Sequence, residues 1–178
     1  MDNPITILEG CILYDRQSQE KLYRQFYPGL YALCKKFFEE EHDILSALNN
    51  GMLNVFQNIK QYDASKGELF SWAYSIVRNA ALTYLRNKNN ISETVELVAD
   101  IEFDQQKSPF KTLEWKDIYF YLGKLPAATR AVCTLYYVEG FSIKEIASQL
   151  QLKEGTIKWH LNESRTRLKI IFNQIPIG

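Results

Sequence analysis

Side chains that suit nucleic-acid recognition concentrate in two stretches of this sequence. The first stretch runs from Phe141 to Lys169. Cationic, aromatic and amide side chains recur there on one side of a helical pattern, at Lys158, Trp159, Asn162, Arg165 and Lys169. Side chains of these types read base edges in a major groove, while lysine and arginine at the margins neutralise phosphates. The chemistry expected of this stretch is therefore recognition of duplex DNA.

The second stretch is the loop Gln61–Glu68, in which Asp63 and Gly67 are turn residues. Tyr62 would stack on a base there, and Lys66 would hold a phosphate. A loop of this kind can hold a base that has left the double helix. The alternative is an ordinary surface turn with Tyr62 folded onto the core.

Helices must position both stretches. Ser142 and Glu145 form a capping box before a short amphipathic helix, and Gln151–Gly155 break it before a second, longer helix. This pattern predicts a helix-turn-helix, with a plain helical hairpin as the alternative. The apolar side of the second helix is expected to consist of Ile157, Leu161, Ser164, Leu168 and Ile171.

The first half of the chain also shows helical periodicity. An apolar stripe runs from Leu22 to Phe37, where Pro28 and the glycine after it should bend or break the helix. A second helix is expected over Asp43–Ile59, and a third, very apolar one over about Leu69–Asn87.

Composition and charge place these elements in two domains. The 178 residues are 46% hydrophobic and carry no net charge. Residues 1–90 are neutral, with ten basic and ten acidic side chains, whereas residues 91–108 hold one and five, and residues 109–178 hold ten and six. We predict an all-α fold of two small helical domains, 1–90 and 109–178, joined by a flexible acidic linker, 91–108.

The same composition argues against several other classes of protein. No apolar run approaches the roughly 20 residues that cross a bilayer, and a signal-peptide pattern is missing, so we expect a cytoplasmic protein without membrane insertion. Cys11, Cys34 and Cys133 are expected to be reduced packing residues. No metal or other cofactor is expected, because His42 and His160 lie in different domains. Phosphate-binding glycine loops and nucleophile motifs are also missing, so we do not expect an enzyme.

Three longer segments make a family resemblance visible. They read LYRQFYPGLYALCKKFF, then YDASKGELFSWAYSIVRNAALTYLRNK, then LPAATRAVCTLYYVEGFSIKEIASQLQLKEGTIKWHLNESRTRLK. Together they resemble an extracytoplasmic-function (ECF) sigma factor of the sigma-70 family, over about residues 9–172. The resemblance implies a promoter-specificity subunit that binds bacterial core RNA polymerase, directs transcription initiation and melts promoter DNA. It also implies a sigma-two domain and a sigma-four domain.

The resemblance carries residue roles with it. Polymerase binding, to the clamp helices of the largest subunit, would fall on Asp43, Leu45, Leu48, Asn49, Met52 and Phe56. Capture of the minus-ten element would fall on Tyr62, Lys66, Phe70, Ser71, Trp72, Arg78, Asn79 and Arg86. Reading of the minus-35 element would fall on Lys153, Glu154, Thr156, Lys158, Trp159, His160, Glu163 and Arg165. For Phe70 and Trp72, packing in the core is an equal alternative.

Some positions depart from the family pattern. Ser46, Asn49 and Asn50 replace acidic or Gln-Glu residues on the helix that would bind the clamp, and Lys153 replaces the usual serine N-cap of the recognition helix. We therefore hypothesise that a recruiting protein assists promoter binding. An anti-sigma factor is a further expected partner, on the apolar side of Ile44–Ile59.

Two other classes of protein remain open at this point. A conventional dimeric helix-turn-helix regulator would bind intact duplex DNA at two-fold half-sites. An adaptor would use its apolar helices to bind a partner helix.

Overall fold

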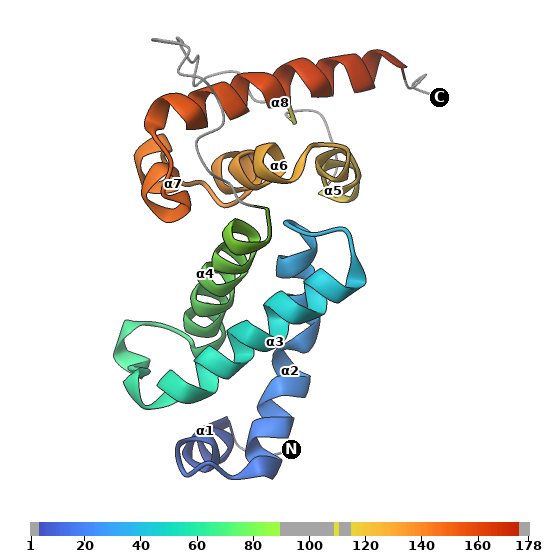
Figure 1. Ribbon diagram of the computed structural model, residues 1–178. Coiled ribbons are helices and arrows are strands. Elements are labelled where there is room, and N and C mark those ends of the chain that lie inside the picture. The colour runs from blue at the N-terminus through green and yellow to red at the C-terminus, as the bar shows by residue number, and fades with distance from the viewer. Residues whose placement is uncertain (1–3, 90–108, 111–114, 175–178) are drawn as a thin grey trace. The chain divides into compact units, whose positions relative to one another are not determined.

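The computed structural model describes residues 4–89, 109–110 and 115–174, and all its regular elements over these residues are helical. The chain divides into two compact units, Met1–Tyr84 and Leu85–Gly178 (Figure 1). The all-α prediction is therefore confirmed. The predicted linker, 91–108, lies outside the described residues, and the domain boundaries at 90 and 109 stay predictions.

The first unit is built from α1 (Pro4–Ile12), α2 (Arg16–Lys35), α3 (Glu41–Asn58) and most of α4 (Leu69–Asn89). The short 3-10 helices η1 (Ile59–Gln61) and η2 (Ala64–Lys66) connect α3 to α4. Helix α1 was not predicted from the sequence. The other three helices lie where the apolar periodicity placed them, within a few residues at each end.

Helix α2 is continuous through Pro28, so of the predicted bend or break the break is excluded. Its apolar stripe is buried as expected, at Leu22, Phe26, Leu30 and Leu33. Gly29 has a packing role instead of a chain-breaking one. A Cβ atom at Gly29 would lie 2.7 Å from the Phe70 ring, so the missing side chain makes room for that aromatic group.

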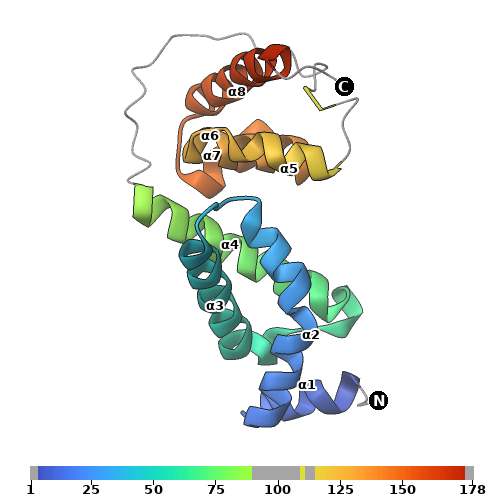
Figure 2. The ribbon, with the colours of Figure 1, turned by 90° about the vertical axis from the view of Figure 1, so that its right-hand side faces the viewer.

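Helices α3 and α4 approach each other closely at Gly51. A Cβ atom there would lie 2.8 Å from the Cα atom of Val77, which is closer than side chains tolerate. Figure 2 shows α3 and α4 from the side, with α2 next to them. This close contact packs α3 against α4 about two turns after the start of α4, where the loop predicted to capture a base ends.

The second unit consists of α5 (Trp115–Gly123), α6 (Ala127–Cys133), the π-helical turn η3 (Thr134–Val138), α7 (Ile143–Leu150) and α8 (Glu154–Gln174). One cluster of its buried side chains consists of Phe110, Ile118, Leu122, Leu125, Cys133 and Leu168. Gly140 has a φ of +78° and follows η3, and the next N–H, of Phe141, donates to the Leu135 carbonyl at 3.0 Å. Glycine suits this left-handed position after a helix because it has no side chain.

Pro126 is the N-cap of α6. Two smaller expectations can be compared with the structure. The three cysteines are free and buried, as predicted. Among the described residues, none of the helices has the length and apolarity that a membrane span requires.

Candidate nucleic-acid and polymerase interfaces

Helices α7 and α8 form the predicted helix-turn-helix. The Ser142 N–H donates to Glu145 Oε2 at 2.8 Å, and the Glu145 N–H donates to Ser142 Oγ at 3.3 Å, which completes the capping box. Gln151 ends α7 in the left-handed region, with φ 55°, and the Leu152 N–H donates to the Ala147 carbonyl at 3.0 Å. These local bonds turn the chain sharply into α8.

Helix α8 has one buried side and one side directed away from the core. Ile157, Leu161, Ser164 and Leu168 are buried, as their spacing predicted. The opposite side carries residues that are exposed or half-buried: Gly155, Lys158, Trp159, Asn162, Thr166 and Lys169. Their spacing of three and four residues places them on one face. We call this set the α8 outer face.

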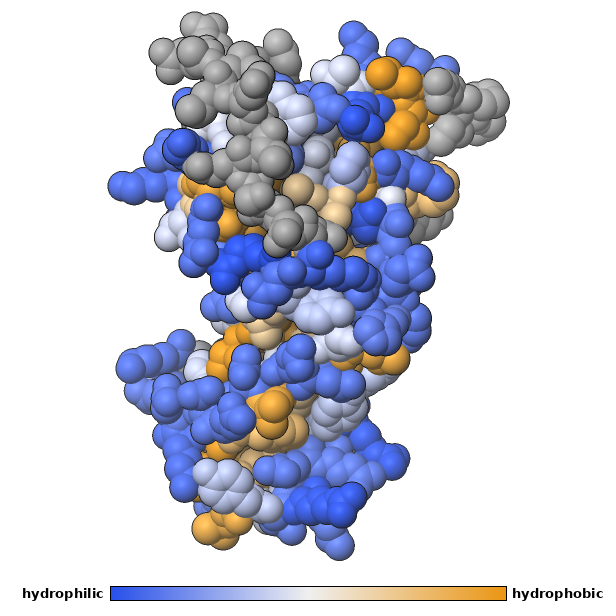
Figure 3. All heavy atoms as spheres, in the orientation of Figure 1, coloured by the Kyte–Doolittle hydropathy of each residue, from blue (hydrophilic) through white to orange (hydrophobic). Residues whose placement is uncertain are grey.

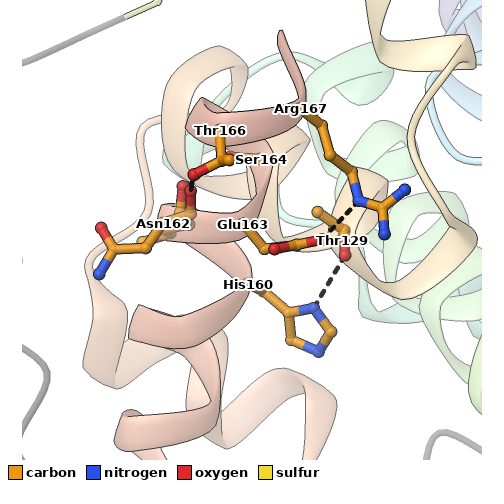
Figure 4. A network of polar contacts seen from close by, with 8 residues as sticks. Thr129, His160, Asn162, Glu163, Ser164, Thr166 and Arg167 are labelled. Atoms are coloured by element: carbon orange, nitrogen blue, oxygen red, sulfur yellow. Dashed lines mark hydrogen bonds and ion pairs between the residues drawn. The ribbon is translucent and has the colours of Figure 1, made fainter. Parts of the chain in front are cut away.

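Two of the residues assigned to the minus-35 element lie inside the unit. Thr156 is 6% exposed and His160 is 7% exposed. The Nδ1 atom of His160 is 3.0 Å from the Thr129 hydroxyl of α6 (Figure 4). Burial lowers the pKa of His160 from 6.5 to about 4, so the imidazole is neutral at physiological pH. The expectation that His160 touches DNA or solvent is therefore corrected.

Two further candidates on α8 make side-chain contacts within the second unit. Arg165 donates from Nε to the Tyr137 hydroxyl at 2.7 Å, and its guanidinium lies 5.9 Å from the centre of that ring. Glu163 accepts from Arg167 at 2.6 Å, one helical turn away (Figure 4). Of the predicted set, Lys153, Glu154, Lys158 and Trp159 remain directed outward or half-exposed. Asn162, Thr166 and Lys169 lie on the same outer face but were not in the predicted minus-35 set. The sequence analysis had placed Asn162 and Lys169 on the polar side of the helix.

In the first unit the loop before α4 encloses a pocket. The pocket has a volume of about 440 Å³. Its lining consists of Gln61, Tyr62, Asp63, Lys66, Gly67, Glu68, Ser71, Trp72 and Ser75. The rings of Tyr62 and Trp72 meet with centroids 5.7 Å apart, and the Tyr62 hydroxyl donates to the Gly67 carbonyl at 2.9 Å. An aromatic wall with polar groups around it suits a planar heterocycle.

Asp63 shapes the loop around this pocket. Its Oδ1 atom accepts from the N–H and the hydroxyl of Ser65, at 3.0 and 2.7 Å. These bonds lower the pKa of the Asp63 carboxyl, so it stays ionised. Lys66 lies 3.5 Å from the same carboxylate, yet its side chain is 82% exposed and can reach an incoming phosphate. Gly67 has a φ of +142°, which a side chain rarely adopts.

The aromatic candidates of this region divide between core and pocket. Phe70 packs edge-on against Phe26, with ring centres 5.2 Å apart, and does not line the pocket. Trp72 does line it. Along α4, Ser71, Ser75 and Asn79 follow at a spacing of four residues, so Asn79 continues the row that begins at the pocket.

The two arginines of the predicted minus-ten set do not line the pocket. Arg78 and Arg86 lie further along α4, where both are half-buried. The pocket therefore combines Tyr62, Lys66, Ser71 and Trp72 from that set, and the arginines stay candidate backbone contacts.

Half of the six side chains expected to contact polymerase are buried. Leu48 and Met52 are buried, and the Asp43 carboxylate is buried beside the Tyr84 hydroxyl, which donates to it at 3.0 Å. Leu45 and Phe56 are half-buried. The exposed residues of α3 in this region are Asn49, Asn50, Leu53, Asn54 and Gln57, which we call the α3 amide strip. Only Asn49 belonged to the predicted set, and its Oδ1 atom accepts from the Tyr23 hydroxyl at 2.8 Å.

The two units together define a class of protein. One presents a helix-turn-helix with an outward-facing second helix, and the other presents an aromatic pocket of a size that accommodates a nucleobase. A helix-turn-helix of this kind is typical of DNA-binding transcription factors, and an aromatic pocket suits a stacked base.

The particular family follows from comparison with known proteins. The family model described as Sigma-70 region 2 matches residues 22–91, and the model described as Sigma-70, region 4 matches residues 116–168. The chain belongs to the sigma-70 family and is an ECF RNA polymerase sigma factor. It is accordingly a transcription initiation factor, and members of this class have no catalytic activity of their own.

The similar proteins span almost the whole chain. The ECF RNA polymerase sigma factor SigM of Bacillus subtilis is 25% identical over 157 residues, with 87% of this chain and 95% of the relative covered. SigM of Mycobacterium tuberculosis is 26% identical over 175 residues, covering 97% and 86%. The sigma factor RpoE of Bartonella quintana, solved in complex with the anti-sigma factor NepR, covers 87% of this chain and 96% of its own, with 20% identity and a TM-score of 0.50. These matches favour a sigma factor over a dimeric helix-turn-helix regulator.

Proposed function

We propose that this sigma factor reads the minus-35 element of its promoters with the α8 outer face. The observation that carries the proposal is the separation of the two sides of α8. Thr156 and His160 are committed to the interior, which leaves Lys158, Trp159 and Asn162 for DNA. Asn162 suits an adenine edge, Trp159 suits a thymine methyl group, and Lys158 suits a guanine or a phosphate.

The pocket of the first unit is the proposed site for a base of the minus-ten element. Trp72 and Tyr62 offer aromatic faces for stacking, and Ser71 and Gln61 offer polar groups to a base edge. Lys66 stands at the rim for the backbone phosphate. Holding one base outside the double helix would favour the open form of the duplex, which is the basis of promoter melting in this proposal.

Core polymerase binding is assigned to the α3 amide strip instead of the buried leucines. The strip contains four amide side chains and one leucine, so it has no charge that would complement a basic surface on the polymerase. This neutrality supports the hypothesis that a recruiting protein assists promoter occupancy. Efficient specific transcription by the chain and core polymerase alone, at physiological salt, would contradict that hypothesis.

An anti-sigma factor is proposed as a regulatory partner. The apolar side of Ile44–Ile59 is not the expected docking surface, because Ile44, Val55 and Ile59 are buried. Leu53 is the large apolar side chain that α3 exposes, at 54%. On the face that Figure 3 shows, apolar side chains form small patches among hydrophilic ones. The anti-sigma factor would therefore contact Leu53 and the neighbouring amide side chains of the α3 amide strip. All these partners place the proposed site of action in the cytoplasm.

Transcription in vitro tests the proposed function. Purified full-length chain and sigma-free core polymerase are incubated with fragmented genomic DNA of the source organism, and the RNA 5′ ends are sequenced. We expect start sites that share two spaced elements. Lys158→Ala should weaken transcription from them, whereas Lys124→Ala, an exposed lysine at the end of α5, should not. Shared start sites that the Lys158→Ala chain transcribes as well as the wild type would overturn the DNA-reading proposal. Core binding without any shared start sites would point to a missing recruiting protein, and absence of core binding would overturn the polymerase proposal.

A further inference from the structure

A buried hydrogen bond joins the recognition helix to a helix outside the helix-turn-helix. The Thr129 hydroxyl on α6 and Nδ1 of His160 on α8 are 3.0 Å apart, with exposed fractions of 2% and 7%. Figure 4 shows the imidazole directed at Thr129, with the Glu163–Arg167 ion pair beside it. Neither Thr129 nor His160 faces outward, so a role for the pair must act through the position of α8.

Apolar contacts between two helices tolerate small relative rotations, because hydrophobic burial has no direction. Ile157, Leu161 and Leu168 provide contacts of that kind on the buried side of α8. A buried hydrogen bond is directional, and each partner would be left unsatisfied if the bond were lost. The Thr129–His160 bond therefore defines the rotation of α8 about its axis more sharply than packing does.

Small rotations matter for reading bases. A side-chain tip about 6 Å from a helix axis moves by about 1 Å when the helix rotates by about 10°. Good hydrogen bonds span a range of only about 0.5 Å in length. A rotation of this size would therefore take Lys158 or Asn162 away from one base edge and toward another.

We propose that Thr129 and His160 are positioning residues for promoter recognition, which fix the rotation of α8 and thereby determine the base pairs that its outer face reads. The proposal rests on the proposed reading of the minus-35 element by α8. It makes discrimination between promoters depend on a pair of residues that never touch DNA.

The test measures discrimination and folding separately. Start sites mapped with the wild-type chain define the minus-35 consensus, and templates with single base changes in it are then transcribed with core polymerase. The main variant, Thr129→Val combined with His160→Leu, replaces both partners by apolar groups and leaves no unsatisfied atom. His160→Asn keeps a polar group near the position of Nδ1, and Thr129→Ser keeps the hydroxyl. Ile157→Val is the matched control, since it weakens packing on the same side of α8 without changing a polar group.

A mismatched base pair in a specific site typically costs roughly 5- to 150-fold in affinity. We expect the paired variant to stay folded, as judged by circular dichroism, and to lose about tenfold of this discrimination. His160→Asn, Thr129→Ser and Ile157→Val should discriminate like the wild type. The proposal would be overturned if the double variant folds and its discrimination is unchanged. If the double variant does not fold, the single variant Thr129→Val is measured instead, and unchanged discrimination there would overturn the proposal. Failure of the proposed function itself appears earlier, as a wild-type chain without a minus-35 consensus.

Discussion

The buried imidazole of His160 should make the second unit sensitive to mild acid. Burial lowers the pKa of His160 from 6.5 to about 4 in the folded chain. Between these two values the unfolded chain binds a proton that the folded chain does not. Stability from this residue is therefore fully present above the unfolded pKa and is lost as the pH falls toward the folded pKa.

The size of the effect follows from these two pKa values. Linkage between pH 7 and pH 5 gives a loss of about 2 kcal/mol in the free energy of unfolding, because nearly all of the unfolded chain is protonated at the lower pH. For a unit of this size the melting temperature should fall by about 10 °C. The Glu145 carboxyl titrates outside this window, since its bonds to Ser142 lower its pKa below the usual value of 4.5.

The assay needs a signal from the second unit alone. The chain has three tryptophans. Replacing Trp72 and Trp115 by phenylalanine leaves Trp159, whose ring centre lies 4.9 Å from that of His160. Thermal unfolding followed by fluorescence at pH 7, 6 and 5 then reports on α8. A His160→Gln variant in the same background is the control, because glutamine does not titrate.

We expect the melting temperature of the parent chain to fall with pH, while that of the His160→Gln chain stays level. Equal melting temperatures at pH 7 and pH 5 in the parent would refute a buried neutral imidazole. The same pH dependence in both chains would show that another group is responsible. His42, the other histidine, belongs to the other unit.

Three further substitutions test other parts of the structure. Gly51→Ala should destabilise the first unit by about 1–3 kcal/mol, because its Cβ atom would meet Val77 at 2.8 Å, and urea unfolding measures this loss. Ser142→Ala should cost about 1 kcal/mol in the second unit by removing the cap of α7; an unchanged melting curve would contradict the capping box. Leu53→Asp should weaken core polymerase binding at least about tenfold in fluorescence anisotropy. Leu13 is more exposed than Leu53, at 79% against 54%, and lies outside the α3 amide strip, so Leu13→Asp should bind like the wild type.

Most of the fold could be predicted from the sequence because amphipathic helices show a regular spacing of apolar residues. The apolar stripes of α2, α3, α4 and α8 and the capping box of α7 are local signals, and all of them appear in the structure. The continuity of α2 through Pro28 has a clear cause. Proline weakens a helix locally, but α2 is held along its length by Phe26 and Leu30 in the core, and tertiary packing outweighs the local cost.

The candidate interfaces were harder to predict because they depend on which side of a helix is buried. Family motifs predict functional roles for α3 and α8, and these roles stay predictions. Their assignment to residues did not distinguish side chains that face outward from those that stabilise the helix. Leu48 and Met52 are apolar, as expected of a docking surface, yet both side chains are buried in the core.

His160 illustrates the limit most clearly. Its position lies next to Trp159 on the helix, and its polar ring suits DNA as well as a buried hydrogen bond. Only the presence of the Thr129 hydroxyl, 31 residues earlier in the chain, decides between these roles. A polar residue on a recognition helix therefore has two ways to influence promoter choice: by contact with a base, or by fixing the helix that makes the contact. In our proposal Thr129 and His160 act in the second way, and the sequence alone does not show that these two residues are in contact.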